Sequence, residues 1–325
     1  MTTNKCNNFL ALGVLVKRNI KLYMKDKMTV FFSLLAPIIV LVLYILFLGD
    51  LQVQNIMATI GDAVSETEVR ALVNNWMISG VMGVSCVTVA LSANIIMVRD
   101  RMSGNVNDII SSPVKRWVLY LSYIISCFII TFTICLIVLF LSIIYLACTG
   151  GLMMSFSDFL VILCVTVISV LSSAFFMVLI CSFIKTTSAL AALNGVFSTA
   201  IGFLIGAYLP FSMLPDYIQY IGCFIPGTYS ASLFRNYFMG GVMEHLQGKI
   251  PPETLNQLLG DYSINLNLFG KTITPGWMVF AILVSIVLFA ALLAIFYSNK
   301  KTNFFAMGKK IKLRKSKKAK NGEAK

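Results

Sequence analysis

The sequence predicts an all-α membrane protein with six transmembrane helices, an N-terminal interfacial amphipathic helix and re-entrant helices before the last span. Two observations support this fold class: long segments without charge, and the placement of basic residues between them. Of 325 residues, 58% are hydrophobic and 12% are charged, whereas soluble domains carry about 25% charged residues. We divide the chain into an N-terminus (1–29), a six-span domain (30–299) and a polybasic tail (300–325).

Six stretches of the chain contain no charged residue. Each has the ~20 residues that a helix needs to cross the ~30 Å hydrocarbon core of a bilayer. The stretches run from Met28 to Gly49, Ala71 to Val98, Trp117 to Ser157, Phe159 to Ile184, Thr186 to Pro215 and Thr272 to Asn299. The sequence therefore predicts six spans.

The basic residues set the orientation. Lys and Arg fall almost entirely into alternate gaps, so that 22 of the 26 lie on one side, and nine of the 13 acidic residues lie on the other. By the positive-inside rule, both termini are predicted to be cytoplasmic. The net charge of +13 sits in short loops and termini, which argues against nucleic-acid binding.

The segment before the first span has an amphipathic pattern. Lys17, Arg18, Lys21 and Lys25 share one arc of a helical wheel. Apolar residues gather on the opposing side: Phe9, Leu12, Val16, Ile20 and Tyr23. This spacing favours a helix lying along the inner membrane surface. The alternative is the basic flank of a signal anchor, which needs no helix.

Two external regions separate the spans. The first gap, Asp50 to Arg70, is acidic and is predicted to be a short solvated loop. The second, 210–274, contains an apolar stretch from Tyr217 to Phe234 that Pro226 and Gly227 interrupt. Such a stretch makes a poor crossing, and it suits a pair of short helices dipping into the outer leaflet.

The tail and the cysteines allow more than one reading. The eleven basic residues of the tail fix topology and contact anionic membrane lipids, or dock a cytoplasmic partner. Most of the cysteines lie in apolar runs without ligand-like spacing, which is typical of buried packing. Cys148 and Cys223 both fall near the outer face, so whether they pair stays open.

The residue inventory contains no catalytic or metal constellation. His245 is the single histidine, so a histidine-based metal site or catalytic relay within the spans is excluded. The segment Asn265 to Thr272 ends in Gly-Lys-Thr but lacks the first glycine of a phosphate loop. The chain is therefore predicted to bind no cofactor and not to hydrolyse ATP. Because the spans also lack Asp, Glu, Lys, Arg and His, ion coupling is disfavoured.

Two segments resemble type-2 ABC exporter permeases. Arg99-Asp100-Arg101-Met102-Ser103-Gly104, continuing through Ile109-Ile110 to Ser112-Pro113-Val114, is similar to the family's cytoplasmic loop after the second span. Asp100 stands where the family commonly has Glu, and Asn105 and Asn107 replace its usual Thr and Glu. The second segment comprises Pro210, Leu214-Pro215, Ile225-Pro226, Tyr229 and Arg235, and it resembles the family's outer motif.

The resemblance implies a permease that dimerises with an identical or related copy, each copy paired with a cytoplasmic ATP-binding cassette subunit that holds ATP and Mg. The loop after the second span would be a short cytoplasmic coupling helix, with the contact residues Arg99, Asp100, Gly104, Asp108 and Pro113. The outer re-entrant motif would contain Pro215, Pro226, Tyr229 and Arg235. The second and fifth spans would line the translocation path, with Asn94, Asn194 and Ser198 as candidates; hydrogen bonding between helices is their alternative role.

Together with this resemblance, the sequence predicts a non-catalytic permease subunit of an ATP-driven exporter in a prokaryotic plasma membrane. Its expected substrate is lipophilic or amphiphilic, of the drug, antibiotic, lipid or glycan type. An ion-coupled secondary carrier or channel is the first alternative, and a membrane enzyme acting on lipid is the second.

Overall fold

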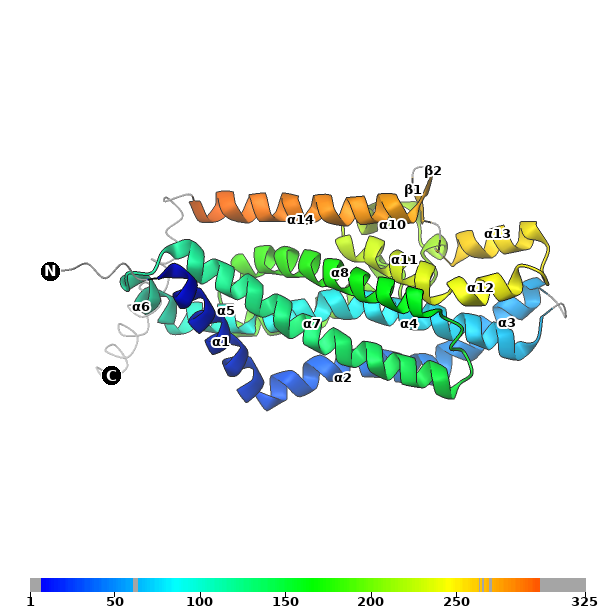
Figure 1. The fold of residues 1–325 in the computed structure, drawn as a ribbon, viewed down its shortest axis with the longest axis horizontal. Coiled ribbons are helices and arrows are strands. Elements are labelled where there is room, and N and C mark those ends of the chain that lie inside the picture. Colours follow the sequence, from blue (N-terminus) through cyan, green and yellow to red (C-terminus); the bar gives the residue numbers. More distant parts are fainter. Residues whose placement is uncertain (1–6, 61–63, 263, 265, 269–270, 299–325) are drawn as a thin grey trace, which may run out of the picture.

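The computed structural model describes residues 7–60, 64–262, 264, 266–268 and 271–298. In them the chain is a bundle of long helices lying side by side (Figure 1). Among the described residues, six helices are long and apolar enough to span a membrane, as predicted. The tail, 300–325, lies outside the described residues.

The chain begins with two helices that meet at a sharp corner. Helix α1 (Asn8–Lys25) and helix α2 (Lys27–Leu43) are separated by Asp26 alone. The Asp26 backbone N–H donates to the Tyr23 carbonyl at 3.0 Å, and its carboxylate accepts from the Thr29 N–H at 3.2 Å. Asp26 therefore ends one helix and caps the next.

The first span is longer than predicted. Helix α2 continues through a π-helical turn (Tyr44–Leu48) into α3 (Gly49–Ile60). The predicted solvated loop beginning at Asp50 is therefore wrong over its first half. Val53 and Ile56, three residues apart, are both buried where α3 packs on α4. Burial of this apolar pair stabilises helix over loop.

The second span forms the centre of the bundle. This span, Glu66–Ser103, consists mainly of α4 (Glu66–Ala93). It is buried over 89% of its most hydrophobic stretch, whereas the buried share is 17% for the fifth span and 11% for the sixth. A Cβ atom added at Gly83 would lie 2.8 Å from the Cβ of Ala231. The missing side chain at Gly83 thus allows a neighbouring helix to approach the centre of the molecule.

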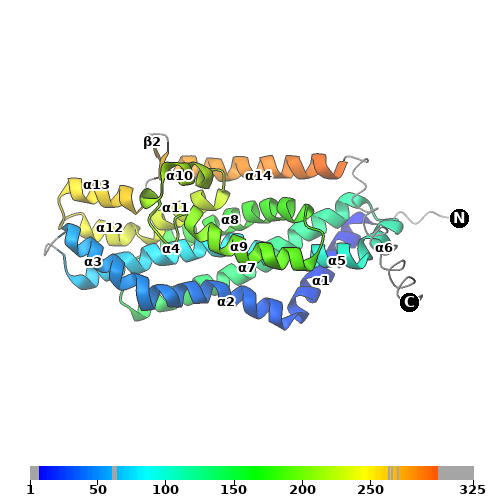
Figure 2. The ribbon, with the colours of Figure 1, turned by 180° about the vertical axis from the view of Figure 1, so that it is seen from behind.

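After a break at Asn94, the chain turns at one end of the bundle and crosses three more times. Figure 2 shows these helices from behind. They are α5 (Ile95–Ser103), α6 (Asn105–Ser111), α7 (Arg116–Cys148), α8 (Phe156–Ser182) and α9 (Thr187–Leu204).

The region 210–274 folds into short elements before the last span. The predicted pair of short helices is present as α10 (Asp216–Cys223) and α11 (Pro226–Phe238), and Pro226 occupies the first turn of α11, where proline is favoured. The remaining elements are a 3₁₀ turn (Phe211–Met213), α12 (Gly240–Leu246), α13 (Pro252–Asp261), an antiparallel hairpin of β1 (Leu266–Leu268) and β2 (Lys271–Ile273) with Asn267 opposite Thr272, and α14 (Pro275–Ser298).

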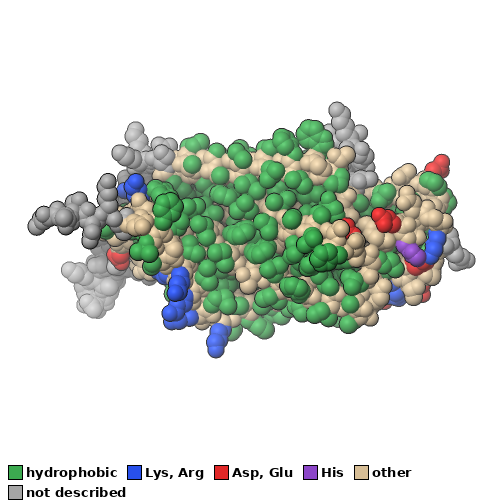
Figure 3. Space-filling view, viewed as in Figure 1, with side chains coloured by type: hydrophobic (Ala, Val, Ile, Leu, Met, Phe, Trp, Pro, Cys, Tyr) green, Lys and Arg blue, Asp and Glu red, His purple; other side chains and the backbone are tan. Residues whose placement is uncertain are grey.

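The surface divides into a wide apolar middle and two polar ends. Figure 3 shows hydrophobic side chains over the middle, Lys and Arg side chains mainly near one end, and Asp, Glu and His side chains towards the other. We call the end that holds α1, α5 and α6 the basic end, and the end that holds α3, α12 and α13 the opposite end. This separation is what a polytopic membrane protein requires.

Candidate functional site

The segment between the second and third spans folds as two short helices at the basic end. Helices α5 and α6 meet at Gly104, which has a φ of +86°. A Cβ atom there would meet nothing closer than the Asn107 amide nitrogen at 4.0 Å. The left-handed backbone, rather than lack of space, therefore requires glycine at this joint.

Asp100 is the centre of the basic end. Its side chain is buried, and its two oxygens accept hydrogen bonds from Arg18 at 2.6 and 2.7 Å. The Tyr123 hydroxyl donates at 2.9 Å and the Asn105 amide at 3.3 Å. One carboxylate thus ties together α1, α5, α6 and α7, and its charge is matched by a bidentate guanidinium.

The N-terminal helix is attached to the bundle through Arg18. Hydrogen bonding to Asp100 raises the pKa of Arg18, so its guanidinium stays charged. Of the four basic residues predicted to face the membrane surface, Lys17, Lys21 and Lys25 are exposed. Arg18 instead faces the protein. Its side chain is 30% exposed.

The remaining predicted coupling residues lie at the surface of the basic end. Arg99 pairs with Asp26 at 2.7 Å, and this contact lowers the pKa of Asp26. Asp108 and Pro113 are exposed. The sequence prediction missed Arg101, which donates to the carbonyls of Cys181, Ser182 and Ile184 at 2.6–3.2 Å. It fastens the end of α5 to the end of α8.

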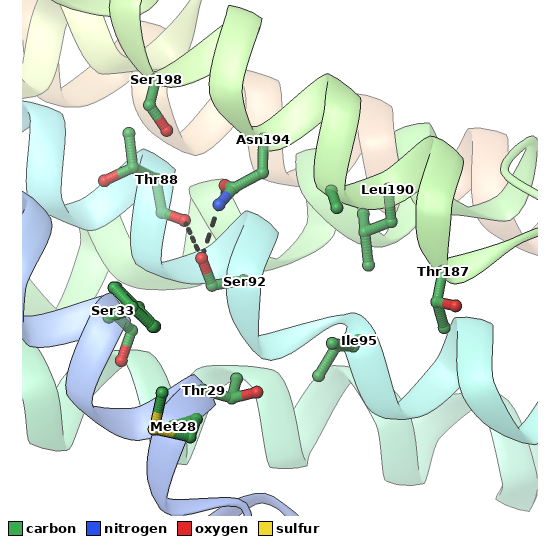
Figure 4. A pocket seen from close by; sticks show the side chains of 12 residues that line it. Met28, Thr29, Ser33, Thr88, Ser92, Ile95, Thr187, Leu190, Asn194 and Ser198 are labelled. Atoms are coloured by element: carbon green, nitrogen blue, oxygen red, sulfur yellow. Dashed lines mark hydrogen bonds between the residues drawn. The ribbon is translucent and has the colours of Figure 1, made fainter.

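A cavity of about 230 Å³ lies between the first, second and fifth spans. Figure 4 shows hydroxyl and amide groups on its walls, and Ser92 contacts Asn194 at 3.4 Å. Among the described residues, no charged side chain lines it. The polar lining residues are Thr29, Ser33, Thr88, Ser92, Thr187, Asn194 and Ser198.

The three residues predicted for the translocation path do not all meet. Asn194 and Ser198 line the cavity, whereas Asn94 lies elsewhere, at the break between α4 and α5. Its amide nitrogen donates to the Ala90 carbonyl at 2.7 Å and contacts the Cys127 sulfur at 3.4 Å. Asn94 therefore faces α7 rather than the cavity.

The cavity wall is joined to the N-terminal helix. The Tyr23 hydroxyl donates to the Ser33 hydroxyl at 3.0 Å, and Ser33 donates on to the Val30 carbonyl. Burial raises the pKa of Tyr23 to about 12, so the phenol remains a donor. Because Arg18 and Tyr23 lie on the same helix, α1 connects the Asp100 cluster to the cavity.

The second segment of the family resemblance, from Pro210 to Arg235, packs against the end of the second span that lies away from the basic end. Arg235 is fully buried, donates to the Gly206 carbonyl, and lies over the Trp76 ring at 5.6 Å from its centre. Pro226 is buried and Tyr229 half-buried. Pro215 is exposed. The motif therefore connects α11 to α4 and to the end of α9.

Neither a metal-binding cluster nor a phosphate loop is found among the described residues. No group of three His, Cys, Asp or Glu side chains gathers among them. Lys271 and Thr272 belong to strand β2, whereas the equivalent residues of a phosphate loop open a helix. Cys148 and Cys223 carry free thiols.

Several site residues escaped sequence analysis, although a signal was present. Thr88 and Ser92 on α4, and Thr29 and Ser33 on α2, are spaced by four, as are Asn194 and Ser198. Such pairs share one face of a helix. Polar pairs at this spacing inside apolar spans therefore indicated a polar face, and this signal could have identified the cavity residues. No signal in the sequence indicated that Tyr123 would bind Asp100, because a tyrosine near a membrane boundary is common.

These features define a polytopic helical membrane protein with a polar, uncharged cavity and a tied pair of short helices at its basic end. A family model described as ABC-2 type transporter matches residues 11–239. The chain belongs to this family, and it is the transmembrane permease component of an ABC transporter. No individual curated protein matches it.

Proposed function

We propose that this permease moves a lipophilic or amphiphilic substrate out of the cytoplasm or inner leaflet of a prokaryotic plasma membrane. In this proposal the basic end and both termini face the cytoplasm, because basic residues favour that side. A separate ATP-binding cassette subunit supplies the energy and holds ATP and Mg, and the chain itself binds no cofactor and catalyses no reaction.

The observation that carries the proposal is the connection from α5 and α6 to the cavity. The ATPase subunit would press on the exposed face of these short helices, which includes Asp108. The Asp100–Arg18 pair would pass that motion to α1, and the Tyr23–Ser33 hydrogen bond would pass it to the cavity wall. Each contact joins two elements that are rigid helices, as mechanical coupling requires.

The cavity is proposed as part of the translocation path. Its hydroxyl and amide groups suit a substrate with a few hydrogen-bonding groups on an apolar body. Met28, Phe32 and Leu190 supply the apolar part of the lining. Asn194 and Ser198 would contact the substrate, and Asn94 would position α4 against α7. The pair α10 and α11 would form the re-entrant helices of the outer leaflet.

A second permease copy is proposed to pack against α9. Gly195 on this helix has nothing within 4 Å of an added Cβ, so Gly195→Trp spares the protomer but would block a partner. We expect this variant to elute as a monomer in light-scattering chromatography. Ala291→Trp on the exposed side of α14 is the matched control and keeps the dimer. A dimeric Gly195→Trp variant would place the interface elsewhere.

The test of the whole proposal is reconstitution. Purification in mild detergent is expected to co-isolate a cytoplasmic subunit with an intact Walker A motif. Vesicles holding both should export fluorescent amphiphiles only with ATP, and replacing the partner's phosphate-loop lysine should abolish export. If the chain alone moves these compounds down an imposed ion gradient, it acts as a secondary carrier instead.

Charge reversal tests the docking face. Asp108→Lys should reduce recovery of the ATPase subunit while leaving membrane insertion unchanged. Asp216 is also exposed but lies in α10, away from the basic end. Asp216→Lys should therefore recover the subunit at the level of the unaltered chain. Equal recovery from both variants would remove α6 from the docking face.

A further inference from the structure

A second cavity, which we call the groove, lies on the side of the third span that faces away from α1. It has a volume of about 450 Å³ and opens between α7, α8 and α14 at the basic end. Its walls are mainly apolar and aromatic, from Trp117, Tyr120, Leu121, Phe175 and Leu293 among others. The cavity shares no residue with the polar cavity described above, so the transport route does not account for it.

The floor of this groove is rigid. Tyr120 and Tyr297 stack with ring centres 3.5 Å apart and planes 15° apart. The Tyr297 hydroxyl also contacts the Ser182 hydroxyl at 2.5 Å. The start of α7 and the ends of α8 and α14 are therefore held together, and the groove exists before anything enters it. A preformed apolar groove loses little entropy on binding.

The mouth of the groove is positively charged. Arg116 lines it, and Lys115 precedes it at an exposed position. No carboxylate of the described part of the chain pairs with Arg116. Helix α7 starts at Arg116, and its first turn has no side-chain cap, so free backbone N–H groups add to the positive potential. Trp117 is 46% exposed beside them, as is typical of a side chain at the headgroup level.

We propose that this groove binds an anionic phospholipid of the leaflet at the basic end. The headgroup phosphate lies against Arg116 and the start of α7, and one acyl chain runs along Tyr120, Phe175 and Leu293. Charge complementarity selects this occupant, because a neutral apolar molecule would leave Arg116 and the helix terminus unmatched. Basic pockets between membrane helices bind anionic headgroups in this way.

The test is lipid retention by the purified full-length chain in native mass spectrometry. Palmitoyl-oleoyl phosphatidylglycerol is compared with phosphatidylcholine bearing the same chains. We expect one phosphatidylglycerol to stay bound in preference to phosphatidylcholine. Arg116→Ala should lower this preference by about fivefold, the worth of one basic residue at a membrane surface. Lys25→Ala, which removes a charge at the corner of α1 and α2, should retain it.

A second variant tests the groove itself. Ala294 lines it and is exposed on α14, so Ala294→Phe fills the space without disturbing the core. It should reduce retention of phosphatidylglycerol while the apparent Tm without added lipid stays unchanged. Equal retention of both lipids by the unaltered chain, or full retention by both variants, would overturn the proposal. So would a gain of lipid only after truncation at Ser298, because the chain's own tail would then be the occupant.

Discussion

At the scale of single residues, one carboxylate organises the basic end. Asp100 is 3% exposed and accepts from three side chains on three other segments. Burying a carboxylate is costly unless it is paired and hydrogen-bonded. The nearby Arg99–Asp26 pair is more exposed, with side chains 45% and 26% accessible, and such pairs contribute little. The nitrogen–oxygen distances of the Arg18–Asp100 and Arg99–Asp26 pairs are similar, but their expected contributions to the free energy of unfolding differ.

We expect Asp100→Ala to lower the free energy of unfolding by about 2–3 kcal/mol, because Arg18 and Tyr123 lose their shared acceptor. Arg99→Ala should change it by less than about 0.5 kcal/mol. Reversible unfolding in detergent measures both. Arg18→Ala combined with Asp100→Ala should cost less than the sum of the single variants. Strict additivity would show that the contact carries no coupling energy.

Gly104 provides a second prediction at this scale. Gly104→Val forces a β-branched residue into a left-handed conformation, at a cost of about 1–2 kcal/mol, and should reduce ATP-dependent transport. Asparagine tolerates this conformation, so Gly104→Asn should transport at a rate close to that of the unaltered chain. The transport rate and the partner's ATPase rate are measured together. Loss of transport in both variants would point to the side chain's size rather than the backbone.

At the scale of elements, α4 and α11 are joined by small residues. Gly83 allows Ala231 to approach, and Gly80 does the same for Ala207. Both residues lie on one face of α4, three apart. Small residues at such contacts bring backbones close, which is how helices associate in membranes without a hydrophobic driving force. Helix α11 and the segment after α9 are thus held against α4 by shape as well as by Arg235.

We expect Gly83→Val to destabilise the protein by about 1–3 kcal/mol, because its side chain would overlap Ala231 and the contact cannot widen without moving α11. The apparent Tm in detergent should fall accordingly. Gly83→Val combined with Ala231→Gly should recover part of the loss. No recovery in the double variant would show that the destabilisation arises within α4 itself.

At the scale of the whole molecule, charge separates the two ends and should set orientation. We expect a variant that keeps only Cys148 to react with an impermeant maleimide in intact cells, and one that keeps only Cys6 not to react. Cys148 is exposed, whereas Cys223 is half-buried and bonds the Gln219 carbonyl, so Cys148 is the better external reporter. Permeabilised cells give the control labelling of Cys6. Labelling of Cys6 from outside would reverse the proposed orientation.

Much of the fold could be predicted from the sequence because it depends on the hydrophobicity and charge of each segment taken separately. Six uncharged stretches predicted six spans, and Pro226 predicted the break between α10 and α11. The prediction of a loop beginning at Asp50 was wrong for a specific reason. Val53 and Ile56 are buried where α3 packs on α4. The charge pattern of the segment itself does not reveal a contact with another helix. Of the three residues predicted for the translocation path, Asn194 and Ser198 line the polar cavity and Asn94 does not.

The sequence by itself determined the number of spans and the polarity of the two ends, because the cost of placing charge in hydrocarbon acts on each segment separately. Only the tertiary structure decided which polar residues meet. Arg18 and Asp100 are 82 positions apart, and Arg18 shares its arc of the wheel with three lysines that stay exposed. How α1 lies against α5 and α7 decides which of the four basic residues pairs with Asp100. The position of α1 is in turn fixed by packing over the whole bundle.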